Sequence, residues 1–135
     1  MTRLSAFRLL VVVSVVFYLA WMLLPYAPRE FPPTVRDLLV SGGYGGSPWV
    51  VSPTFYLSLG AAKVAASVGL FWLQSWGRWL LLAVVVIGLA SAAFAGISVG
   101  VPLDNIVAYC ATLTDGAILA IAFCSPIAEA LRKSA

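Results

Sequence analysis

Two ionisable residues, Lys63 and Asp115, lie inside long apolar stretches of the sequence. Each stands about ten residues past the start of its stretch, near Pro53 or Asn105, which corresponds to about 15 Å along a helix. That depth is the middle of a bilayer whose hydrocarbon core is about 30 Å thick. An unpaired charge there costs at least about 2.5 kcal/mol, so opposite charges at one depth predict an ion pair between the two helices.

Such a pair is compatible with two roles. As a functional site it would relay protons or ions, or form a polar hole for a small substrate, because charges inside a membrane often mark transport paths. As a structural contact it would fix one packing arrangement of the helices. Possible polar neighbours of the pair are Tyr56, Ser67 and Thr112. A relay needs several polar stations, and the only nearby candidates for these are Thr112, Thr114, Tyr56 and Tyr109. We therefore favour the structural role and keep the relay as an alternative.

Residues for catalysis or metal binding are scarce. The chain has no histidine, and no acidic residue stands beside a serine or cysteine to form a nucleophile–base pair. Its 2 cysteines, Cys110 and Cys124, lie about 21 Å apart along one expected helix, which is too far for an intrachain disulfide. The sequence also lacks a ligand set for zinc or haem. We expect no enzymatic activity, no metal and no cofactor.

The composition indicates a membrane protein. Hydrophobic residues make up 62% of the 135 residues and charged residues 10%, whereas soluble chains contain about 45–50% and about 25%. A soluble domain of this size could not bury so much apolar surface. The net charge is only +3 and there is no basic run, so we expect no binding of nucleic acid. Residues 1–135 are predicted to form a single integral membrane domain whose main partner is the lipid bilayer.

Four apolar segments are long enough to span a bilayer as helices. They comprise residues 9–27, 53–74, 79–99 and 105–125. Helices are favoured because every backbone N–H and C=O must be hydrogen-bonded within its segment in lipid, and the alternation of a β-barrel is missing. Arg3 and Arg8, before the first segment, also resemble the start of a signal peptide. That segment is long and no Ala-x-Ala follows it, so we expect a retained helix.

The connections predict an all-α fold, a membrane-spanning antiparallel four-helix bundle. Two connections, around residues 75–78 and 100–104, are so short that the helices they join must be antiparallel neighbours. The connection at 26–52 is a long loop, in which Pro32-Pro33-Thr34 could begin one short helix on the membrane surface. Small residues let helix backbones approach closely. The expected packing positions are Gly60, Gly88, Ala92, Gly96 and Gly116.

The basic residues predict the orientation of the chain in the membrane. Lys and Arg are enriched in connections on the cytoplasmic side. With both chain ends in the cytoplasm, that side receives Arg3, Arg8, Arg78, Arg132 and Lys133. The other side receives only Arg29 and Arg36. We therefore expect a multi-pass protein with a cytoplasmic N-terminus and a cytoplasmic C-terminus.

Three motifs carry a family resemblance. They are Ser75-Trp76-Gly77-Arg78-Trp79, Gly96-Ile97-Ser98-Val99 and Asp115-Gly116-Ala117-Ile118-Leu119-Ala120, the last followed by Ser125-Pro126. On these motifs the chain resembles the small uncharacterised four-helix inner-membrane proteins of proteobacteria. The resemblance implies a location in the bacterial inner (plasma) membrane and a four-helix architecture. It implies no activity and no catalytic residue.

Three functions fit this description. The first, which we favour, is a structural or accessory subunit that packs against another membrane protein or against copies of itself. The second is an immunity protein against a membrane-targeting toxin, because small four-helix inner-membrane proteins resemble those that give such protection. The third is a small transporter or channel subunit that uses the pair of Lys63 and Asp115. It would need oligomers, because a single small bundle leaves little room for a path.

Overall fold

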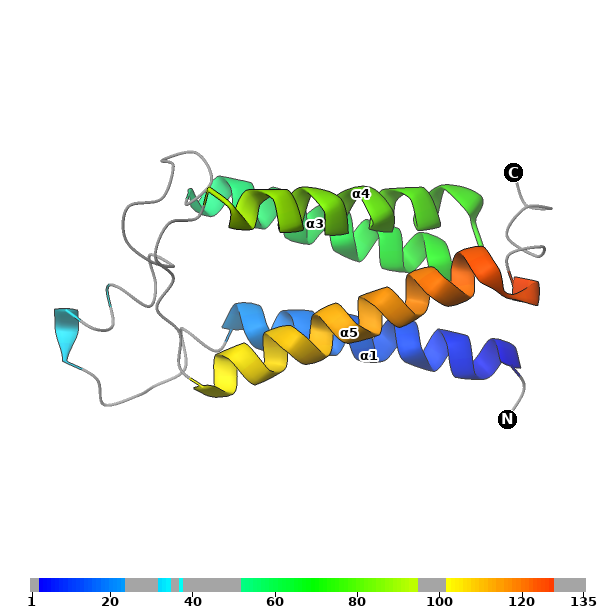
Figure 1. Ribbon diagram of the computed structural model, residues 1–135, viewed down its shortest axis with the longest axis horizontal. Helices are drawn as coiled ribbons and strands as arrows, with labels where there is room; N and C mark the ends of the chain where they lie inside the picture. Colours follow the sequence, from blue (N-terminus) through cyan, green and yellow to red (C-terminus); the bar gives the residue numbers. More distant parts are fainter. Residues whose placement is uncertain (1–2, 24–31, 35–36, 38–51, 95–101, 128–135) are drawn as a thin grey trace.

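Helices make up most of the described part of the chain. The computed structural model describes residues 3–23, 32–34, 37, 52–94 and 102–127 (Figure 1). Within these residues the fold is all-α, with four long helices and no strand. Of the short helix expected after Pro32, the structure describes helical conformation at Pro33, Thr34 and Asp37. Apart from Pro32 and Ser52, the rest of that loop lies outside the described residues.

The four helices cover most of the expected segments. They are α1 (Arg3–Leu23), α3 (Pro53–Phe71), α4 (Ser75–Ala92) and α5 (Pro102–Cys124). Each is long and apolar enough to cross a membrane, which suggests a multi-pass membrane protein. α4 and α5 begin a few residues before residues 79 and 105, where the segments were expected to start. The expected segment ends at 24–27 and 95–99 lie outside the described residues.

The start of α3 is set by Ser52 and Pro53. The Ser52 side-chain oxygen accepts a hydrogen bond from the N–H of Phe55 at 3.3 Å, which caps the helix. Pro53 follows in the first turn, where its missing N–H and its fixed φ are favourable. α5 likewise begins at a proline, Pro102, which explains why it starts before the apolar segment does.

A tight turn reverses the chain between α3 and α4. Leu73 has a left-handed conformation, with φ 59°. Its N–H donates to the carbonyl of Leu70 at 3.0 Å, and the N–H of Gln74 donates to the carbonyl of Gly69 at 2.8 Å. This is the Schellman arrangement, which satisfies the last carbonyls of a helix. α4 therefore begins at Ser75, directly after the turn.

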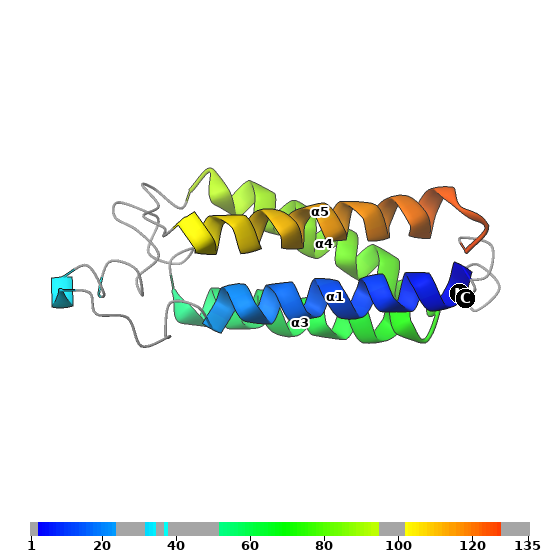
Figure 2. The same cartoon turned by 90° about the horizontal axis from the view of Figure 1, so that it is seen from below.

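The helices pack as two close pairs, α1 with α5 and α3 with α4. The pairs meet through the less extensive contacts of α1 with α3 and of α4 with α5. All four helices lie side by side along the long axis of the molecule, as in a bundle (Figures 1 and 2). The buried apolar core draws on all four. Its members are Phe7, Val11, Ala66, Leu70, Leu81, Ile118 and Ala122.

α3 and α4 come into backbone contact at Gly69 and Gly77, which the sequence analysis did not select as packing positions. A Cβ on Gly77 would lie 2.7 Å from the backbone nitrogen of Leu70 and 2.8 Å from the carbonyl carbon of Gly69. A Cβ on Gly69 would lie 2.8 Å from the ring of Trp76. No side chain fits between the two helices here, so glycine is required at this contact.

The expected packing positions differ in where they lie. A Cβ on Gly60 would lie 3.2 Å from a side-chain atom of α1, and a Cβ on Gly88 would lie 3.8 Å from a side-chain atom of α3. Both glycines therefore face a neighbouring helix. A Cβ on Gly116 would meet nothing within 4 Å, because Gly116 follows an inward-facing residue and is turned about 100° away from it. Ala92, the last residue of α4, is exposed. Gly96 lies outside the described residues.

We expect Gly77→Ala to destabilise the protein by about 1–3 kcal/mol, because the added methyl group meets backbone atoms that cannot move aside. Gly116→Ala is the matched control. Its methyl group enters open space, so stability should be unchanged or should rise by up to about 1 kcal/mol. Thermal unfolding in detergent, followed by circular dichroism, measures both variants. Equal stability of the two would show that α3 and α4 are not in backbone contact.

Candidate functional site

The structure brings Lys63 of α3 and Asp115 of α5 together in an ion pair. The ammonium group of Lys63 donates a hydrogen bond to Oδ2 of Asp115. The two side chains are 3% and 10% exposed, so the protein shields the pair almost completely. In such surroundings each charge depends on its partner, because an uncompensated buried charge is strongly destabilising.

A serine on α1 completes the hydrogen bonding of the carboxylate. The hydroxyl of Ser14 donates to Oδ1 of Asp115 at 2.5 Å, and the serine itself is buried. Each carboxylate oxygen therefore has a donor, one charged and one neutral. A hydrogen bond to a charged acceptor contributes about 1.5–3 kcal/mol, more than one between neutral groups. The sequence analysis did not select Ser14, although its hydroxyl interrupts a run of valines in the first apolar segment.

Tyr18, one turn after Ser14 on α1, lies over the ammonium group. The centre of its ring is 5.0 Å from Nζ of Lys63, within the range of cation–π attraction. Its hydroxyl oxygen would lie only 3.2 Å from a Cβ on Gly60, so the glycine leaves room for the ring. Ser14, Tyr18, Lys63 and Asp115, which we call the polar cluster, thus join α1, α3 and α5.

The three polar neighbours expected from the sequence have other partners than the charged groups of the pair. Ser67 is buried, but its hydroxyl donates to the backbone carbonyl of Lys63 in its own helix at 2.9 Å. Thr112 is exposed, and its hydroxyl donates to the carbonyl of Ala108 at 2.9 Å. Tyr56 packs edge-on against the adjacent Phe55 ring, with ring centres 5.8 Å apart. In the described part of the chain, none of the three donates to the charged groups of the pair.

Arg8 forms a second link between α1 and α3, at the end of α3. Its Nε–H donates to the carbonyl oxygen of Phe71 at 3.2 Å, and its guanidinium carbon lies 5.2 Å from the centre of the Phe71 ring. Arg8 thereby satisfies one of the carbonyls that lack a partner at a helix C-terminus. Arg78, in the first turn of α4, similarly lies 5.8 Å and 5.3 Å from the ring centres of Trp79 and Phe123.

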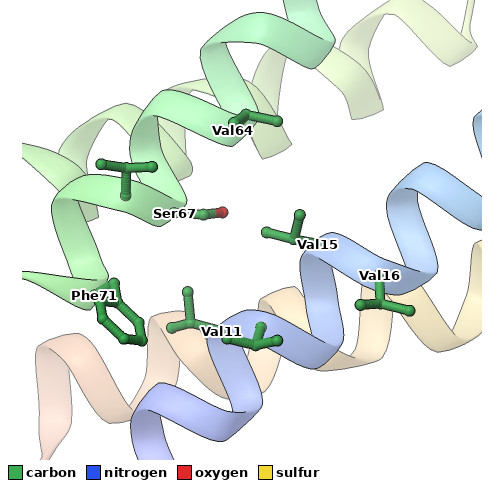
Figure 3. Close-up of a pocket in the computed structure, with 8 residues that line it drawn as sticks. Val11, Val15, Val16, Val64, Ser67 and Phe71 are labelled. Atoms are coloured by element: carbon green, nitrogen blue, oxygen red, sulfur yellow. The ribbon is translucent and has the colours of Figure 1, made fainter.

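The surroundings of the polar cluster limit its chemistry. A groove between α1 and α3 is lined by Ser67 and apolar side chains (Figure 3). Neither Lys63 nor Asp115 is among its lining residues. The described residues contain no group of three or more His, Cys, Asp or Glu that could hold a metal ion. Lys63 and Ser14 occupy the two oxygens of the Asp115 carboxylate, so the cluster is closed among its own members.

Comparison with protein-family models, with curated proteins and with solved structures finds no match to this chain. The resemblance to small inner-membrane proteins therefore stays a prediction from the motifs. The functional argument depends instead on the polar cluster and on the outward surfaces of the helices.

Replacing one member of the pair, by Lys63→Met or Asp115→Leu, should destabilise the protein by about 3–5 kcal/mol, because the other charge stays buried without a partner. The double variant should recover most of this loss, since two apolar side chains leave no charge to bury. The exchanged pair, Lys63→Asp with Asp115→Lys, should also fold. Unfolding in detergent compares these four variants with the wild-type protein. A double variant as unstable as the sum of the two single variants would exclude a structural contact.

Proposed function

We propose that the chain is a multi-pass protein of the bacterial inner membrane that acts, without enzymatic activity, as a structural or accessory subunit. It would pack against another membrane protein or against copies of itself. The observation that carries this proposal is the complete pairing within the polar cluster. Lys63 and Asp115 are buried, form an ion pair and are hydrogen-bonded. Charges satisfied in this way stabilise one arrangement of helices and leave no free group for a substrate or an ion.

The outward faces of the helices support a location in lipid. Leu89 of α4 and Leu113 of α5 are 76% and 74% exposed, and many other large apolar side chains are exposed as well. Soluble monomers rarely expose apolar surface so extensively. Lipid tails would cover these side chains without penalty, because the tails are equally apolar.

An antiparallel arrangement with both termini in the cytoplasm is part of the proposal. The start of α1, the turn between α3 and α4 and the end of α5 lie at one end of the bundle, which supports this arrangement (Figure 1). Arg8 contacts Phe71, the last residue of α3, and Arg78 lies in the first turn of α4. Basic residues gathered at one end agree with the enrichment of Lys and Arg on the cytoplasmic side.

α4 carries the surface that we propose for docking. The buried residues of α4 (Gly77, Leu81 and Val84) reach only to its middle, whereas those of α5 run along the whole helix, so in the described part of the chain the remainder of α4 has no buried residue. Val86 and Leu89, three residues apart and therefore on one side of α4, are both exposed. A partner helix would gain close van der Waals contacts along such a face, which drive helix association in lipid.

A photo-crosslinking residue at Val86 or Leu89 should attach the protein to its partner in intact membranes, because both side chains are exposed on the same side of α4. The same residue at Leu113, exposed on α5, is the matched control and should give less product. Mass spectrometry of the product distinguishes another protein from a second copy. Absence of product from both α4 positions would contradict the proposal. So would recovery of the chain in the supernatant after the membranes are pelleted.

A proton or ion path through an oligomer is the second candidate function. The observation in its favour is the burial of two opposite charges beside a serine and a tyrosine, since intramembrane charges often serve transport. Against it, Ser67 and Thr112 bond to carbonyls of their own helices and add no station to a relay.

Proton flux in liposomes separates the two candidates. If the pair is structural, liposomes with the wild-type protein should acidify at the rate of empty liposomes, because the paired charges have no free partner to exchange protons with. Liposomes with the double variant Lys63→Met/Asp115→Leu provide the control for leakage around the protein. A wild-type flux above that of empty liposomes, abolished in the double variant, would instead favour the path.

A further inference from the structure

A shallow groove runs between α1 and α3 (Figure 3). Its lining residues are Val11, Val12, Val15, Val16, Val64, Ser67, Val68 and Phe71. The hydroxyl of Ser67 is used within α3, so the groove presents little besides aliphatic and aromatic carbon. Val12, Val16 and Val68 are exposed, which shows that the groove opens outward from the bundle.

The dimensions of the groove favour one kind of occupant. From Val64 to Phe71 it extends about 10 Å along α3 at the rise of an α-helix. Its volume is about 210 Å³. A slender hydrocarbon chain can lie along a groove of this length and volume. An α-helix with its side chains is about 10 Å wide, which is too thick to enter.

A positive charge lies at the Phe71 end of the groove. Arg8 uses its Nε–H for the carbonyl of Phe71, which leaves the terminal N–H groups of its guanidinium. No acidic side chain of the described residues forms a salt bridge with it. The planar guanidinium fork is well matched to the oxygens of a phosphate group.

We propose that the groove and Arg8 together bind one anionic phospholipid. An acyl chain lies along the valines, and the phosphate contacts the guanidinium of Arg8. The inference depends on the membrane location and orientation proposed above, which put Arg8 at the cytoplasmic surface. Anionic lipids are found in the cytoplasmic leaflet, where they attract basic residues close to the membrane.

Native mass spectrometry in mild detergent tests the headgroup contact, with phosphatidylglycerol and phosphatidylcholine of identical acyl chains as probes. The wild-type protein should bind phosphatidylglycerol about fivefold more tightly, the preference that one basic residue provides at an anionic surface. Arg8→Gln should remove this preference, and Arg8→Lys should retain part of it. Arg78→Gln is the matched control and should keep it, because Arg78 lies on Trp79 and Phe123, away from the groove.

A phosphatidylglycerol with a photoreactive group in its acyl chain tests the groove. It should label peptides that contain the groove residues of α1 and α3. Val68→Trp fills the groove and should abolish the label, whereas Val86→Trp, at an exposed valine of α4, should leave it unchanged.

Three outcomes would overturn the lipid site: equal binding of the two lipids, an unchanged preference in Arg8→Gln, or labelling outside the groove. Cross-linking of two chains through groove residues would assign the groove to a second copy and would overturn it as well. Pelleting of membranes separates this failure from failure of the proposed function. A chain in the pellet without lipid preference contradicts only the lipid site, whereas a chain in the supernatant contradicts both.

Discussion

The buried charge of Asp115 is the constraint on which the packing of the helices depends. It is held by Lys63 from α3 and by Ser14 from α1, because an uncompensated charge in this interior would be strongly destabilising. The three helices must therefore meet at matching heights and rotations. Apolar helices in lipid have no hydrophobic force that would select one packing among many. The polar cluster makes that selection between the two helix pairs, where contacts are fewer than within either pair.

Within the pair of α3 and α4, the close fit of the two backbones selects the arrangement of the helices. Gly69 and Gly77 bring the two backbones into contact, and the left-handed Leu73 closes the turn that joins them. Dispersion between closely packed atoms depends on fit and not on polarity, so it acts in lipid as well as in water. The bundle thus combines close packing within a pair and a charged contact between pairs. A change at Gly77 acts on the first, and a change at Lys63 acts on the second.

Hydropathy was sufficient to predict the four helices, because only a helix satisfies the backbone of a long apolar segment. Equal depth was sufficient to expect Lys63 beside Asp115. Depth does not say which way a side chain faces, and a helix that is apolar on all sides has no polar face to reveal its rotation. Ser14 was missed for this reason. Thr112, selected as a possible polar neighbour of the pair, and Gly116, selected as a packing position, both face outward.

The groove lies at the junction of α1 and α3, between the contact of Arg8 with Phe71 and the polar cluster. An acyl chain in the groove would make van der Waals contacts with the side chains that line it, which in the described part of the chain lack a protein neighbour on that side. A phosphate on Arg8 would also hold the arginine that caps the end of α3. The lipid and the ion pair would then favour the same arrangement of the two helix pairs through different forces. Only the lipid depends on the composition of the membrane, so that composition would set how firmly the pairs associate.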